Sequence, residues 1–264
     1  VLTESSRKKF AGTSAEIVGT YDLDGVDIDW EYPGLRGEDN VFRAEDKQNF
    51  TLMFKAIREE LDKLSSRTGK SYQVTTALPC FPRLFEVTDM GKAAEYLDFV
   101  NIMAYDFYVA GDTAGHHSNL YPAESYEKEE SGDKAYDLYT KAGVPAEKLV
   151  LGIPFYGRSW FMKSDDNRGI NRAVDSVTRG GGFTFIKDSI MTKPDFVRYW
   201  DEKAKAPYLW NAKTRQLVTY DDEESVKVKC EYVKARKMGG VMFWQYASDP
   251  KEYLLTAVNE HLYK

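Results

Sequence analysis

The chain has 264 residues, 42% of them hydrophobic and 14% aromatic, which is enough apolar material for one large domain or two small ones. Its formal net charge of −6 and isoelectric point near 5.3 argue against binding to nucleic acid or to an anionic membrane. No apolar run reaches the ~18 residues of a spanning helix, so we expect no membrane span.

The cysteine count and the first residues restrict the class of protein further. Two cysteines, Cys80 and Cys230, are too few for a disulfide framework or a zinc site, so we expect two free buried thiols. No signal peptide is visible at Val1, where the sequence opens in a helix-like stretch.

Strand-like and helix-like stretches alternate along the chain. Helical spacing of apolar residues is clearest in the first two helices, with Phe10, Ile17 and Val18 in one and a stripe from Phe50 to Leu64 in the other. The elements expected in chain order are a helix over 4–20, a strand over 24–33, a helix over 44–64, a strand over 72–79, a helix over 92–96, a strand over 98–106, a helix over 134–142, a strand over 148–157, a helix over 222–237, a strand over 239–246 and a helix over 253–261.

This alternation predicts a parallel α/β sheet with crossover helices. The stretch 158–220 departs from it, because it is rich in turn residues and aromatics and has short strand-like pieces at 182–186, 208–211 and 216–220. We interpret 159–220 as a small α+β insertion domain and 1–158 with 221–264 as the main domain. Polar and aromatic residues gather at the carboxyl ends of successive strands, where a (β/α)8 barrel builds its active site.

The first strand has the most unusual pattern in the chain. Side chains alternate along a strand, so Val26, Ile28 and Trp30 point to one face, and three carboxyl groups point to the other, roughly 6–7 Å apart. These three are Asp27, Asp29 and Glu31. Neighbouring like charges raise at least one pKa, as a general acid near neutral pH requires. The pattern therefore predicts a catalytic site with Glu31 as its acid.

Two structural explanations of the acidic run were weighed. A solvated acidic loop has no reason to interleave its acids with Val, Ile and Trp. A calcium loop starting at Asp22 would need glycine at its sixth position, but Gly25 falls at the fourth. Asp24, on the other parity, is expected to be structural.

The segment DGVDIDWEYPG, residues 24–34, resembles the DGxDxDWE signature of the family 18 glycoside hydrolases, the chitinases, and matches it at every defined position. The resemblance implies a (β/α)8 TIM barrel in which this strand is the fourth. Strands four to eight would then lie in this chain, the first three would not, and the insertion would fall between strands seven and eight.

The resemblance also implies substrate-assisted hydrolysis, in which the 2-acetamido oxygen of the sugar attacks its own anomeric carbon. Glu31 would then protonate the leaving oxygen and later act as base. Asp29 would hydrogen-bond the acetamido N–H, Asp27 would share a proton with Asp29, and Tyr105 would donate its hydroxyl to the acetamido oxygen.

Further matches to the family lie in the later strands. The segments 103–106, 155–158 and 241–245 resemble its sixth, seventh and eighth strands. They imply substrate-binding roles, with an indole floor under the reacting sugar, for Met103, Asp106, Tyr156, Arg158 and Trp244. The corresponding structural explanations are core packing for the aromatic residues and a bridge to the insertion for Arg158.

The implied substrate is chitin or a chito-oligosaccharide, bound by a monomer with no cofactor and no metal, and the implied location is secreted or periplasmic. An endo-β-N-acetylglucosaminidase acting on N-glycans and a non-catalytic chitin-binding lectin of the same fold are the alternatives. Family lectins usually lose the terminal acid, which Glu31 supplies here.

Several other features are expected to be structural. His116 and His117 have no third metal ligand at usable spacing, so we expect a solvated or cleft-edge loop. Gly180–Gly182 is expected to be a flexible loop, and Glu127–Glu130 a solvated charge run. The insertion's tryptophans either extend the sugar platform or fill a small core, and the core is favoured for Trp200.

Overall fold

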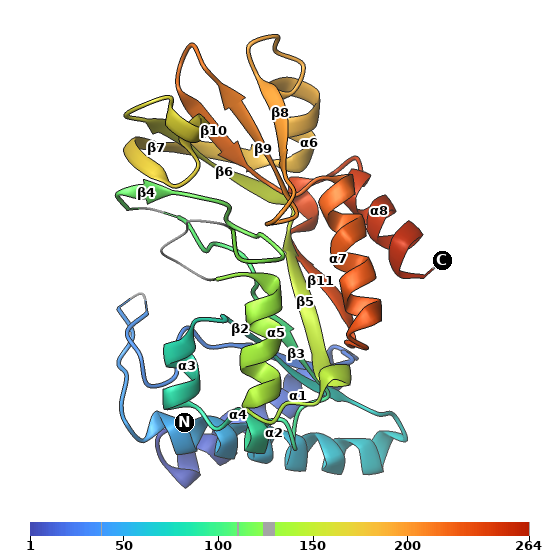
Figure 1. Cartoon of the computed structure of the whole chain (residues 1–264). Helices are drawn as coiled ribbons and strands as arrows, with labels where there is room; N and C mark the ends of the chain where they lie inside the picture. The colour runs from blue at the N-terminus through green and yellow to red at the C-terminus, as the bar shows by residue number, and fades with distance from the viewer. Residues whose placement is uncertain (38, 110, 124–129, 264) are drawn as a thin grey trace. The chain divides into compact units, whose positions relative to one another are not determined.

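The computed structural model describes residues 1–37, 39–109, 111–123 and 130–263, so most of the charge run Glu127–Glu130 lies outside it (Figure 1). The chain divides into two compact units. The first comprises Val1–Ile102 and Tyr136–Val150, and the second comprises Met103–Ala135 and Leu151–Lys264.

The first unit is built on three parallel strands in the order β1-β2-β3. Helices α1 and α2 lie side by side along these strands. The elements of this unit are α1 (Glu4–Thr20), β1 (Gly25–Asp29), α2 (Asp46–Thr68), β2 (Gln73–Leu78), α3 (Pro82–Val87), α4 (Met90–Ala93), β3 (Phe99–Ile102) and η1 (Ala146–Lys148). Two elements, α5 (Gly132–Lys141) and β5 (Leu149–Pro154), have residues in both units.

Helix α2 confirms the predicted stripe. Every apolar residue of that stripe is buried, and Gly69 ends the helix in a left-handed conformation with φ of 74°. The stripe consists of Phe50, Met53, Phe54, Ile57, Leu61 and Leu64. The Phe50 ring lies 6.1 Å from Trp30, on the apolar face predicted for the first strand.

Helix α1 has the predicted bounds but buries a different face. Phe10 and Ile17 are exposed, while the small residues Ala11 and Ala15 are buried with Val18. Small side chains let α1 lie close against its neighbour α2. The prediction that Phe10 and Ile17 mark the core face of this helix is wrong.

Gly25 allows β1 to pair closely with β2. A Cβ atom at this position would lie 2.0 Å from the carbonyl oxygen of Gln73, its partner in the parallel register. Glycine is therefore required at this position, before the carboxyl ladder, because any side chain would collide with the neighbouring strand.

The second unit combines the end of the parallel sheet with an antiparallel sheet of order β4-β7-β6-β10-β9-β8. In Figure 1, α7 and α8 lie side by side next to β11, which neighbours β5. The elements are β4 (Thr113–Ala114), β6 (Tyr156–Met162), η2 (Asp166–Gly169), β7 (Arg172–Gly182), α6 (Phe183–Phe185), η3 (Ile186–Ile190), β8 (Val197–Asp201), β9 (Ala206–Asn211), β10 (Gln216–Thr219), α7 (Glu223–Ala235), β11 (Gly240–Trp244), η4 (Tyr246–Ser248) and α8 (Tyr253–Leu262).

All five predicted parallel strands are present, but two expectations for the intervening stretch are wrong. Gly180–Gly182 ends β7 instead of forming a loop, because a Cβ on Gly180 would lie 1.9 Å from the carbonyl oxygen of Gly157 on β6. The predicted strand over 182–186 is helical from Phe183 onward, since Phe183 and Ile186 pack into the core beside Phe155.

The tryptophans of the stretch 158–220 and the two cysteines differ in their burial. Trp160 and Trp210 are buried, so the core explanation holds for them, whereas Trp200 is only half-buried. Cys80 and Cys230 are free and buried, as predicted. Burial raises the pKa of the Cys230 thiol to about 11, which keeps it protonated and unreactive at neutral pH.

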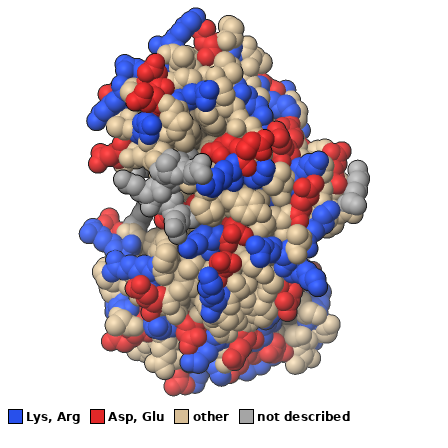
Figure 2. Space-filling view, in the orientation of Figure 1, with Lys and Arg blue, Asp and Glu red and all other residues tan. Residues whose placement is uncertain are grey.

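The surface is polar, and the helices have the character expected of a chain without long apolar runs. Over the face shown in Figure 2, Lys and Arg are interspersed with Asp and Glu. Within the described ranges, every helix is too short or too polar to cross a bilayer.

Candidate active site

The predicted site residues fall into two groups, one in each unit. The first group is the carboxyl ladder of β1, where Asp27 and Asp29 are exposed and the alternate residues Val26 and Ile28 are half-buried. Glu31 follows two residues after Asp29 and is also exposed. The predicted alternation of acidic and apolar faces is therefore confirmed.

Asp27 is held by the two strands that follow β1 in the sheet. The Thr75 hydroxyl on β2 donates a hydrogen bond of 2.5 Å to its Oδ1, and the Asn101 amide on β3 donates one of 3.2 Å to the same oxygen. The register pairs Asp27 with Thr75, and Ala77 of the same strand with Asn101. These two donors hold the Asp27 carboxyl group in a fixed orientation.

Asp29 lies between the other two acids of the ladder. Its pKa is raised to about 6, first by the desolvation of its carboxyl group, then by the negative charges of Glu31 and Asp27, and then by a hydrogen bond to Glu31. At neutral pH, Asp29 is therefore poised to take up or share a proton beside Glu31.

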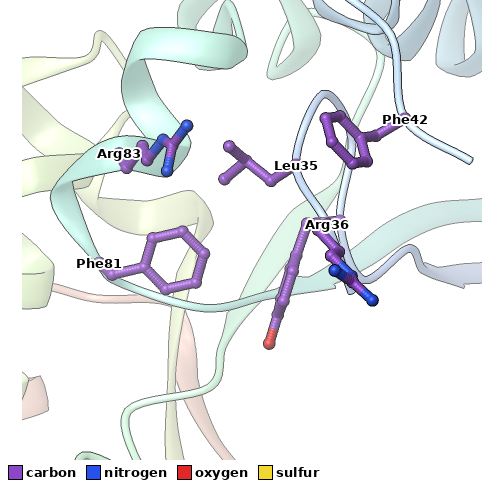
Figure 3. A pocket seen from close by; sticks show the side chains of 6 residues that line it. Leu35, Arg36, Phe42, Phe81 and Arg83 are labelled. Carbon is purple, nitrogen blue, oxygen red and sulfur yellow. The ribbon is translucent and has the colours of Figure 1, made fainter. Parts of the chain in front are cut away.

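A pocket of about 480 Å³ lies beside the segment that follows Glu31. The Tyr32 ring borders it and meets Phe81 edge-on at 5.3 Å between ring centroids. Figure 3 shows the side chains that line this pocket together with Tyr32, which are those of Leu35, Arg36, Phe42, Phe81 and Arg83. The lining of this pocket thus combines aromatic and aliphatic side chains with two arginines.

The second group is centred on the Asp106 carboxylate. Tyr156 donates a hydrogen bond of 2.9 Å to Oδ2, and Arg158 donates from Nε to Oδ1 at 2.8 Å and from Nη2 to Oδ2 at 2.6 Å. Burial by itself would raise the pKa of Asp106, but His117 and Arg158 outweigh it and hold that pKa well below its usual range. Asp106 is therefore an anion throughout the physiological range.

The remaining members of this group present partly exposed side chains. Met103 and Tyr105 alternate with the buried residues Ile102 and Ala104, as predicted for one shared face. The rings of Tyr105 and Tyr156 lie 6.3 Å apart, edge to face. Trp244, at the end of β11, is 56% exposed, so it is a surface indole and not a core residue.

Of the two environments expected for the loop of His116 and His117, solvated or cleft-edge, the solvated one is wrong, because both side chains are fully buried. His116 Nε2 lies 3.2 Å from Oδ2 of Asp201, and its ring packs edge-on against Tyr208. His117 Nδ1 lies 3.5 Å from Oδ1 of Asp106. The polar sequence around this pair concealed its burial against Asp201, Tyr208 and Asp106.

Three supporting residues were missed from the sequence. Thr75 and Asn101 lie in predicted strands, and aligning those strands in parallel register with the carboxyl ladder would have placed them beside Asp27. His117 had no such signal, since a loop residue has no register with a strand.

In the described part of the chain, no group of three His, Cys, Asp or Glu residues lies close enough to hold a metal ion.

Comparison with known proteins gives three concordant results. The profile described as "Glycosyl hydrolases family 18" matches residues 1–249. Chitinase A1 of Niallia circulans is 37% identical over 268 residues, covering 96% of this chain and 38% of its own length. The chain spans less than two thirds of the length of the curated relatives it matches.

Solved structures agree. A family 18 N-acetylglucosaminidase from Paenibacillus barengoltzii aligns with a TM-score of 0.94 and 40% identity, covering 98% of this chain and 77% of that one. A mutant class V chitinase from Nicotiana tobaccum in complex with NAG4 aligns with a TM-score of 0.87 and 26% identity, covering 99% of this chain and 74% of that one.

Proposed function

The chain belongs to family 18 of the glycosyl hydrolases, and on that premise we propose that the protein hydrolyses β-1,4 bonds between N-acetylglucosamine units of chitin or chito-oligosaccharides. The observation that carries this proposal is the carboxyl ladder, in which Asp29 has a pKa raised to about 6 directly beside Glu31. A general acid and a neighbour able to share its proton are the groups that such a reaction requires.

In the proposed mechanism, Glu31 protonates the glycosidic oxygen as the C–O bond breaks. The acetamido oxygen of the same sugar forms a bond to the anomeric carbon, which gives a cyclic oxazolinium-like intermediate. Asp29 hydrogen-bonds the acetamido N–H and stabilises its positive charge. Glu31 then removes a proton from water, which attacks the anomeric carbon, so two displacements give retention of configuration.

Asp27 has a supporting part in this scheme. Its hydrogen bonds from Thr75 and Asn101 keep its charge in place, and that charge favours the protonated form of Asp29. The proton shared between Asp29 and Glu31 can then move as Glu31 changes from acid to base.

The second group supplies substrate contacts. Tyr105 and Tyr156 orient the acetamido group. Asp106 accepts a hydrogen bond from a sugar hydroxyl, and Trp244 supplies a flat surface under the reacting sugar. Met103 lies on the same face as Tyr105 and fills the space beside the sugar, and Arg158 contacts an adjacent sugar. The partial exposure of these side chains supports binding roles over core packing.

We further propose that β1, β2, β3, β5 and β11 are the fourth to eighth strands of a TIM barrel. Residues 159–220 are an α+β insertion domain, supported by the antiparallel strands that this stretch forms, and 1–158 with 221–264 are the barrel part. The protein acts as a monomer and is secreted or periplasmic, where polymeric chitin is accessible.

A specific observation favours a second candidate activity. The Paenibacillus relative at 40% identity is named an N-acetylglucosaminidase, which suggests release of single sugars by this protein as well. Product analysis of an N-acetylglucosamine hexamer digest separates the two: dimers and trimers indicate chitinase action, and accumulation of monomer alone indicates the second. No cleavage of the hexamer, together with release of glycans from a high-mannose glycoprotein, would overturn both.

A further inference from the structure

His117 is a buried titratable group that the proposed mechanism leaves without a role. Its side chain is 0% exposed, although its neighbours in sequence are mostly polar. Its Nδ1 atom lies 3.5 Å from Oδ1 of Asp106, and its ring lies 5.6 Å from the Tyr156 ring. The imidazole therefore faces the carboxylate that already receives hydrogen bonds from Tyr156 and Arg158.

The backbone on both sides of His117 is fixed. Its carbonyl oxygen accepts a hydrogen bond of 3.2 Å from the amide of Phe107, the residue that follows Asp106. The next residue, Ser118, donates a hydrogen bond of 2.6 Å to Oδ2 of Asp221. Lys229 on α7 is 2.7 Å from both oxygens of Asp221, so a buried ion pair anchors this loop.

Asp106 itself adopts a conformation that needs such support. Its φ angle is 61°, in the left-handed region that a residue with a side chain seldom adopts. Strained backbone of this kind persists only where surrounding contacts fix it. The contacts here come from β6 through Tyr156 and Arg158, and from the 116–118 loop through His117.

The charges around His117 determine its protonation. Burial lowers its pKa, and Arg158 lowers it further, while Asp106 and Asp221 act in the opposite direction without reversing the shift. The imidazole is therefore neutral at neutral pH. Neither ring nitrogen has a hydrogen bond of good geometry, and Nδ1 is the one 3.5 Å from Oδ1 of Asp106. A proton on Nδ1 would therefore lie on the side of Asp106, whereas the other tautomer would direct a lone pair at an anion.

We propose that His117 is a positioning residue, a neutral Nδ1–H imidazole that fixes the orientation and charge of Asp106 in the sugar-binding group. This inference rests on the proposed function, because it assigns His117 a place in the binding of N-acetylglucosamine units. Asp106 would contact the sugar, and His117 would act only through Asp106.

The test compares three single variants of the full protein by kinetics on a chito-oligosaccharide between pH 4 and pH 8. His117→Leu removes the donor, and we expect KM to rise by about three- to tenfold with kcat changed by less than about twofold. The rise should be largest at acid pH, because Asp106 then loses its charge at a higher pH. His117→Asn keeps an N–H near the Nδ1 position and should restore KM.

His116→Asn is the matched control, since His116 is equally buried but faces Asp201 and Tyr208. It should leave KM and its pH profile unchanged. Equal KM values for His117→Leu and His117→Asn, or the same effect from His116→Asn, would overturn the inference. Failure of the wild-type protein to cleave the substrate would instead overturn the proposed function.

A spectroscopic measurement keeps the test valid if His117→Leu does not fold. The ring ¹⁵N shifts of wild-type His117, assigned by comparison with His117→Asn, report its tautomer without any substrate. The Nδ1–H tautomer between pH 6 and pH 8 is the expected result. An Nε2–H tautomer or a charged ring would overturn the inference.

Discussion

The guanidinium of Arg158 contacts both carboxylate oxygens of Asp106, with Nε 2.8 Å from Oδ1 and Nη2 2.6 Å from Oδ2. A two-point contact of this kind fixes the plane of the carboxylate as well as its charge. Arg158 and Tyr156 thus contact the same carboxylate.

Replacing Arg158 by Lys keeps the charge but loses the two-point contact. We expect weaker oligosaccharide binding and a higher Asp106 pKa. The depressed pKa of Asp106 contributes stability that is present above its unfolded value of about 3.9 and is lost as pH falls toward the folded value. The variant should lose about 1 kcal/mol at pH 7, a figure reduced for solvent screening because both side chains are about a third exposed.

Urea unfolding at pH 7 and pH 3 measures this effect, and the difference between the two proteins should shrink at the lower pH. Arg215→Lys is the control, since Arg215 donates to the carbonyl of Lys163 at an exposed site. An Arg158→Lys protein as stable as wild type at pH 7, with unchanged binding, would contradict the assigned contact.

Asp29→Asn should make the protein more stable at neutral pH. A carboxyl group whose folded pKa is raised to about 6 holds its proton more tightly in the folded state, so stability falls as pH rises from about 4 to 6. Asparagine removes that loss. The gain should be less than about 1 kcal/mol, because the exposed site is screened by solvent.

Thermal unfolding of Asp29→Asn and of the wild-type protein from pH 3.5 to pH 8 measures this difference in stability. The melting temperatures of the two proteins should coincide below about pH 4 and separate above pH 6. The exposed Asp24, on the opposite parity of the same segment, provides the control Asp24→Asn. Parallel curves for Asp29→Asn and wild type over the whole range would show that the ladder does not raise this pKa.

Lys229→Met should be strongly destabilising. Lys229 and Asp221 are both about 2% exposed and pair at 2.7 Å, so removal of the lysine leaves a buried charge with only hydroxyl partners. Breaking such a pair costs about 3–5 kcal/mol. Denaturant unfolding at pH 7 measures the loss, and Asp221→Asn combined with Lys229→Met should recover part of it. A loss below about 1 kcal/mol for the single variant would be inconsistent with a buried pair.

Phe54→Ala and Phe10→Ala test the assignment of helix faces. Phe54 is fully buried, so its truncation should cost about 3–5 kcal/mol, whereas the exposed Phe10 should cost no more than about 0.5 kcal/mol. Both residues lie in helices, so differences in helix propensity largely cancel. Similar losses at the two positions would contradict this assignment of helix faces.

Local patterns in the sequence predicted much of the first unit. The period-2 alternation over 26–31 and the apolar stripe of α2 are decided by burial alone, so both could be predicted and both are confirmed. The buried face of α1 could not be predicted from the sequence, because packing of Ala11 and Ala15 against a neighbouring helix outweighs the hydrophobicity of Phe10. Gly180 looked like a loop residue for a similar reason: its close approach to Gly157 is visible only once the strands are paired.

The site was predictable where it follows a strand and not where it depends on a loop. Asp27, Asp29 and Glu31 follow from alternation, and the family resemblance supplied Asp106 and Arg158. His117 was expected in a solvated or cleft-edge loop, because nothing in its sequence neighbourhood shows that Asp221 and Lys229 anchor this loop.

The central claim, that Glu31 is the proton donor, is tested most directly by the turnover of a chito-oligosaccharide with Glu31→Gln. Glutamine matches the carboxyl group in size but cannot give up a proton, so kcat should fall by at least about 100-fold while the oligosaccharide still binds. Circular dichroism should show an unchanged fold, since Glu31 is exposed. A Glu31→Gln protein that retained wild-type turnover would contradict the account.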